Sequence, residues 1–74
     1  MERQKMLERL AMAERHVAEG GILLCRQQAL IAELDRDGHD TRDAWTILAT
    51  MLETQRLHVA DRDRILKELS SVST

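Results

Sequence analysis

Apolar residues recur at alternating steps of three and four through most of the chain. In residues 2–37 the pattern is interrupted only by Gln27, and its members are Met6, Leu10, Ala13, Val17, Gly20, Leu24, Ile31 and Leu34. In residues 41–69 the same spacing gives Ala44, Leu48, Met51, Gln55, His58, Arg62, Ile65 and Leu69. A period of this kind is typical of helices that pack side by side. We therefore predict two long α-helices, over about 2–37 and 41–69, with residues 70–74 as a frayed tail.

The break between the two helices is predicted at Asp37-Gly38-His39-Asp40. Gly38 can take the left-handed conformation that ends a helix, and Asp40 or Thr41 can accept a hydrogen bond from the free amides that begin the next helix. The composition agrees, because the 74 residues include no proline and are rich in strong helix formers. The sequence thus predicts a single all-α domain, an antiparallel two-helix hairpin.

The apolar surface of the second helix is wider than one partner helix requires. A second line, Trp45, Leu52, Val59 and Leu66, runs beside its seam. A chain of this size rarely forms a stable core without a disulfide, a metal or a partner, and Cys25 is the only cysteine. We therefore predict association into a four-helix bundle or a larger helical oligomer. The positions expected to carry the core and the oligomer contacts are Leu10, Val17, Leu24, Ile31, Leu34, Trp45, Leu48, Leu52, Val59 and Leu66.

Charge and hydropathy argue against nucleic acid or membrane as partners. Charged residues make up 32% of the chain, but the net charge is only -2 and the two signs are interspersed. Nucleic-acid binding would favour a basic stripe and several aromatics, whereas Trp45 is the only aromatic residue. No apolar run, such as that at residues 22–25, exceeds four residues, far short of the roughly 20 residues that cross a bilayer. These features, together with the lone thiol of Cys25, favour a cytoplasmic protein.

Gly20-Gly21 is the least expected feature of the first helix, because two glycines there cost about 2 kcal/mol relative to alanines. Folding the chain about His39 pairs Leu34 with Ala44, Ile31 with Ile47 or Leu48, and Leu24 with Gln55, and it places Gly20 opposite His58. Three interpretations follow: close approach of another helix, a kink or break in the first helix, or backbone left bare for a ligand.

Two pairs of side chains have the spacing of metal ligands on a helix. His16 and Glu19, and likewise His58 and Asp61, lie three residues apart and therefore on one helix face. His16 is expected at the level of His58 on the other helix, and a dimer would bring two copies of each pair together. The alternative is that these histidines are hydrogen-bonded within the core or at its rim.

Polar residues in the seam have a structural interpretation. Gln27 and Gln55 occupy positions where a polar side chain sets register and oligomeric state. The chain has no phosphate-binding glycine loop, nucleophile elbow or Cys-x-x-Cys pair. We therefore expect no enzymatic activity and no cofactor.

Three segments carry a resemblance that covers nearly the whole chain: residues 36–41 (RDGHDT), 57–64 (LHVADRDR) and 16–20 (HVAEG). They look like a group of short, uncharacterised bacterial helical-hairpin proteins. The resemblance implies the hairpin fold and no particular activity. The leading hypothesis is a non-enzymatic, homo-oligomeric protein–protein interaction module, adaptor or regulatory in role. The alternative is a small metal- or ligand-binding bundle that uses His16, Glu19, His58 and Asp61.

Overall fold

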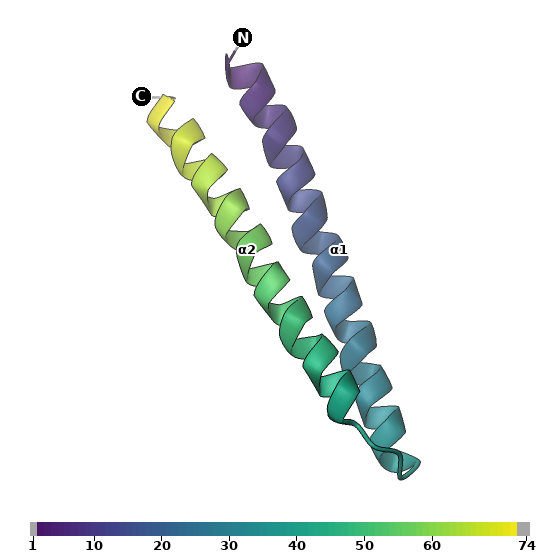
Figure 1. Cartoon of the computed structure of the whole chain (residues 1–74). Helices are drawn as coiled ribbons and strands as arrows, with labels where there is room; N and C mark the ends of the chain where they lie inside the picture. Colours follow the sequence, from purple (N-terminus) through teal and green to yellow (C-terminus); the bar gives the residue numbers. More distant parts are fainter. Residues whose placement is uncertain (1, 73–74) are drawn as a thin grey trace.

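The computed structural model describes residues 2–72, which form two α-helices and no strand. Helix α1 spans Glu2–Arg36 and helix α2 spans Arg42–Val72. The helices run antiparallel and side by side, so that the two chain ends lie at the same end of an elongated molecule of 56 × 14 × 14 Å (Figure 1). The prediction of an all-α helical hairpin is confirmed.

The helix boundaries differ slightly from those predicted. Helix α1 ends at Arg36, one residue earlier than expected, while α2 continues to Val72. The predicted frayed tail was therefore wrong for residues 70–72; its last two residues lie outside the described part of the chain. Nothing in this segment breaks a helix, and the Ser71 hydroxyl donates to the Lys67 carbonyl at 3.2 Å, within the last turns of α2.

Helix α1 ends in the glycine motif that the sequence predicted. Gly38 has a φ of 76°, in the left-handed region. Its amide donates to the Asp35 carbonyl at 3.1 Å, and the His39 amide donates to the Leu34 carbonyl at 2.9 Å. These two bonds define a Schellman motif, which satisfies carbonyls that the end of the helix would otherwise leave free.

An acidic side chain, that of Asp40, lies two residues before the start of helix α2. The Asp40 carboxylate accepts a hydrogen bond from the Arg42 amide at 2.9 Å and pairs with the Arg42 guanidinium at 2.7 Å. The Arg42 side chain, followed by the Arg42 amide, lowers the pKa of Asp40, and the same ion pair raises the pKa of Arg42. Both groups are fully exposed, so this contact directs the start of α2 more than it stabilises the fold.

The core between the helices consists of two separate clusters. Near the chain ends, Met6 and Leu10 pack against the buried residues Ala13, Ile65 and Leu69. Near the turn, Leu24 and Leu34 pack against the buried residues Ile31, Ala44 and Leu48. All of these residues belong to the 3.5-residue seam of the sequence. Between the clusters lies a polar middle layer that contains Gly20, Gln55 and His58.

Candidate functional site

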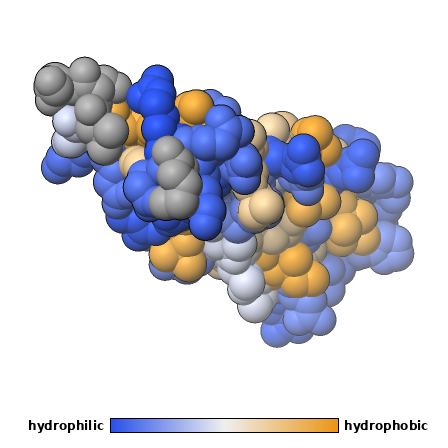
Figure 2. Space-filling model, turned by 90° about the horizontal axis from the view of Figure 1, so that it is seen from above, coloured by the Kyte–Doolittle hydropathy of each residue, from blue (hydrophilic) through white to orange (hydrophobic). Residues whose placement is uncertain are grey.

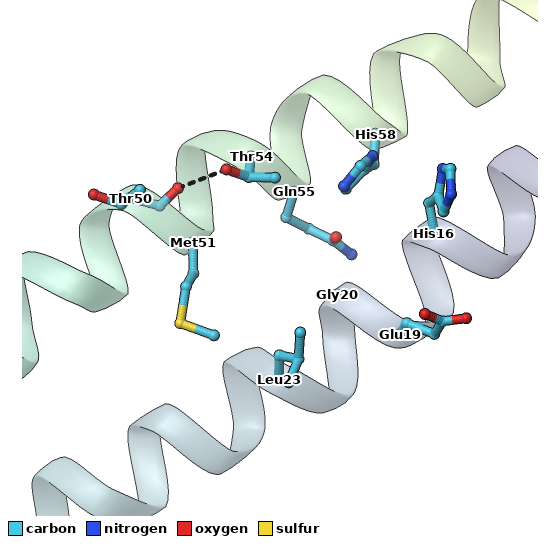
Figure 3. A pocket seen from close by; sticks show the side chains of 9 residues that line it. All are labelled: His16, Glu19, Gly20, Leu23, Thr50, Met51, Thr54, Gln55 and His58. Atoms are coloured by element: carbon cyan, nitrogen blue, oxygen red, sulfur yellow. Dashed lines mark hydrogen bonds between the residues drawn. The ribbon is translucent and has the colours of Figure 1, made fainter.

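The polar middle layer borders a hollow of about 220 Å³ between the helices (Figure 3). Nine residues line it: His16, Glu19, Gly20 and Leu23 from α1, and Thr50, Met51, Thr54, Gln55 and His58 from α2. The hollow is open to solvent on one side of the hairpin. It brings together the histidines, the carboxylate and the glycine that the sequence singled out separately.

Gln55 is fixed by contacts with α1. Its Nε2 donates to the Val17 carbonyl at 2.8 Å. Its Oε1 lies against Gly20, where a Cβ would overlap it and would also be only 2.9 Å from the Gln55 Cδ. That Oε1 is buried and has no hydrogen-bond partner in the structure. Gly20 therefore serves close packing of a side chain from the opposite helix.

The register differs from the predicted one at the middle layer. Gly20 lies against Gln55, one helical turn before the His58 that was expected there. Near the turn, Leu34 and Ile31 pack in one cluster with Ala44 and Leu48, in agreement with the predicted pairing.

Gly21, unlike Gly20, has free space where a side chain would lie. A Cβ at Gly21 would meet no atom within 4 Å, because the residue faces away from Gln55. Helix α1 is not broken at this pair, since it is continuous from Glu2 to Arg36. The break considered from the sequence is thus contradicted, and close packing applies to Gly20 alone.

The second seam glutamine makes an equivalent contact in the other half of the hairpin. Gln27 of α1 donates through Nε2 to the Ala44 carbonyl of α2 at 2.9 Å. Each helix therefore contributes one glutamine side chain whose amide group donates a hydrogen bond to a backbone carbonyl of the other helix. The sequence indicated a register role for both glutamines, but it did not reveal their acceptors.

The two histidines lie next to each other on opposite helices. The ring centroids of His16 and His58 are 5.1 Å apart and the ring planes are tilted by 43° (Figure 3). His16 is exposed and His58 is half-buried. Glu19 lines the same hollow as both histidines. The imidazoles that lie close enough to act together are therefore those of His16 and His58, one from each helix.

Asp61, which the sequence offered as a metal ligand together with His58, makes another contact in the structure. Its carboxylate pairs with Arg64, one turn further along α2, and it does not line the hollow. Within residues 2–72, no group of three or more His, Cys, Asp or Glu side chains is arranged to hold a metal ion. The four-residue set His16, Glu19, His58 and Asp61 is therefore not assembled within one hairpin.

Threonines form a part of the site that the sequence analysis did not single out. The hydroxyls of Thr50 and Thr54 each donate to the carbonyl four residues earlier, at 3.3 and 3.1 Å, and both residues line the hollow. Thr46 does the same at 3.1 Å. Their spacing of four was the available signal, because it places all three on one face of a helix.

The chain matches no known protein family, no curated protein and no solved structure. The resemblance to short bacterial hairpin proteins therefore stays a prediction. Neither helix in the described part of the chain combines the length and apolar character that a membrane crossing needs.

Proposed function

We propose that the hairpin is a non-enzymatic, homo-oligomeric interaction module, which pairs with a second copy and then engages another protein. The observation that carries this proposal is the line Trp45, Leu52, Val59 and Leu66 on α2. Val59 is half-buried, while Trp45, Leu52 and Leu66 are 56%, 47% and 43% exposed. Figure 2 shows hydrophobic residues at the surface among hydrophilic ones.

A complementary line of small residues runs along α1. Its members recur every seven residues and are all exposed: Ala11, Ala18, Cys25 and Ala32. Ala32 and Trp45 border the same groove, of about 430 Å³, so the two lines lie on the same side of the hairpin. We call this side, made of the Trp45 line and the Ala32 line, the tryptophan flank.

A second copy is the occupant that this flank fits. A twofold axis sets the same surface of both copies against each other, so that the large side chains of each α2 meet the small side chains of the other α1. Small residues let helix backbones approach, and large residues fill the remaining space. The result would be a four-helix bundle with the tryptophan flanks inside and the charged residues outside, available to another protein.

The location proposed for this module is the cytoplasm. Cys25 is a free, exposed thiol in the hairpin and lies on the tryptophan flank. A reducing compartment keeps such a thiol unpaired. Burial of Cys25 between two copies would also shield it from thiol reagents, which gives the proposal a chemical readout.

Sedimentation equilibrium of the full chain at micromolar concentration tests the proposal, with Leu52→Glu as the disrupting variant. The matched control is Leu57→Glu: Leu57 is 63% exposed and follows Thr50 by seven residues, which places it beside the hollow on the other flank. We expect dimers for the native chain and for the control, and loss of dimers for Leu52→Glu.

Two further readouts accompany that measurement. The melting temperature should rise with protein concentration for the native chain, as it does when folding is coupled to association. Cys25 should react with a maleimide more slowly as the concentration rises. A native chain that sediments as a folded monomer, with concentration-independent melting, would overturn the proposal.

A further inference from the structure

The ring-centroid distance of the His16–His58 pair matches that of two imidazoles bound to one metal ion. An imidazole nitrogen 2.0–2.1 Å from Zn²⁺ puts the ring centroid about 3.2 Å from the ion, and two such rings at the tetrahedral angle have centroids about 5.2 Å apart. The observed separation is 5.1 Å. We propose that His16 and His58 form a two-point site for a divalent transition-metal ion, which links α1 to α2 at the middle layer.

The surroundings of the pair fit a metal site better than a packed core. The rings lie at one end of a hollow of about 220 Å³, and His16 is exposed, so an ion can reach them. Imidazole is a ligand of choice for Zn²⁺, Cu²⁺ and Ni²⁺. With two ligands from the protein, the remaining coordination positions go to water.

One carboxylate in the same hollow can hold that water or orient the rings. Glu19 lies one turn from His16 on α1 and lines the hollow with both histidines. Ligand histidines and bound waters usually donate to such acceptors, which tune the metal from outside its first shell.

The consequence of binding follows from where the pair lies. The apolar clusters leave the middle of the hairpin without a packed core. An ion held by one ligand from each helix binds the folded hairpin more tightly than the unfolded chain, whose histidines are not held together, so it raises the melting temperature. This inference goes beyond the proposed interaction module, because the pair is on the flank opposite the tryptophan flank.

Thermal melting of the untagged full chain, with EDTA or with ZnCl₂, NiCl₂ or CuCl₂ added, tests the site. The variants are His16→Asn and His58→Asn, and the matched control is His39→Asn in the turn, the third of the three histidines. Circular dichroism without metal establishes that each variant remains helical. The metal affinity is measured by isothermal titration on the same samples.

We expect at least one of the three ions to raise the melting temperature of the native chain and of His39→Asn. Each of the other two variants should lose the shift and bind the ion at least about tenfold more weakly, since loss of an outer-shell partner alone costs ten- to a hundredfold. The absence of a shift in the native chain would overturn the proposal. So would a shift that survives in either His16→Asn or His58→Asn, because then the ion does not need both rings.

Discussion

Gln55 of α2 fills the space that Gly20 of α1 leaves open by having no side chain. The amide nitrogen of Gln55 reaches the Val17 carbonyl from there, and the amide oxygen rests against Gly20. A helix that carries glycine in its interior loses about 1 kcal/mol relative to alanine. In this hairpin the loss is offset by a hydrogen bond between the helices.

The first prediction is that Gly20→Ala and Gln55→Ala are energetically coupled. A methyl group at Gly20 displaces the end of the Gln55 side chain and breaks its bond to Val17, but has nothing to displace once Gln55 is alanine. Chemical denaturation of the single and double variants should give a coupling of about 1 kcal/mol, the net contribution of one hydrogen bond.

Gly21 provides the matched control for this cycle. A methyl group there meets no atom within 4 Å, so Gly21→Ala and Gln55→Ala should be additive within error. Equal coupling for the two glycines would contradict the close packing described for Gly20.

The second prediction concerns Gly38, whose φ of 76° is unfavourable for residues with a Cβ. Gly38→Ala should lower the free energy of unfolding by about 1–2 kcal/mol, the cost of the left-handed conformation. Gly38→Asn should cost less, because asparagine visits this region more readily. Urea denaturation measures both, and a neutral Gly38→Ala would show that the Schellman motif does not constrain the turn.

The third prediction compares a buried and an exposed apolar residue of α2. Ile65 is 2% exposed and lies in the cluster near the chain ends, whereas Leu57 is 63% exposed. Ile65→Ala should destabilise by roughly 2–5 kcal/mol, enough to unfold much of a small hairpin. Leu57→Ala should stay within about 0.5 kcal/mol of the native chain. Similar losses for the two would mean that Leu57 is covered in solution.

The fourth prediction is a pH dependence at the start of α2. The pKa of Asp40 is lowered in the folded state, first by the Arg42 side chain and then by the Arg42 amide. Its stabilising contribution is therefore present above the unfolded pKa, near 4, and is lost as pH falls through the lower folded value. Native and Asp40→Ala chains should differ most in melting temperature at neutral pH and converge as the pH falls below the lowered pKa of Asp40.

Arg42→Ala is the control for that titration. Without the guanidinium only the backbone contact to Asp40 remains, so the pH dependence should weaken without vanishing. If the difference in melting temperature between the native chain and Asp40→Ala is the same at pH 7 and at pH 2, Asp40 does not stabilise the fold through its charge.

Periodicity and turn chemistry in the sequence determine most of the fold. The 3.5-residue spacing identified both helices and the seam, and Gly38 identified the turn, because each depends on neighbours within a few residues in sequence. The second apolar line, Trp45, Leu52, Val59 and Leu66, also followed from spacing alone, and the structure leaves Trp45, Leu52 and Leu66 exposed in the hairpin. The continuation of α2 to Val72 was missed, since a helix end without a strong stop signal is not marked in the sequence.

The tertiary structure alone decided which side chains meet across the seam. Gln55 of α2 lies against Gly20 and reaches the Val17 carbonyl, whereas the sequence register placed His58 opposite Gly20. The tertiary structure also leaves Asp61 to pair with Arg64 along its own helix. A 3.5-residue pattern looks the same after a shift of one turn, so the sequence could place His16 at the level of His58 but could not fix which side chain meets Gly20.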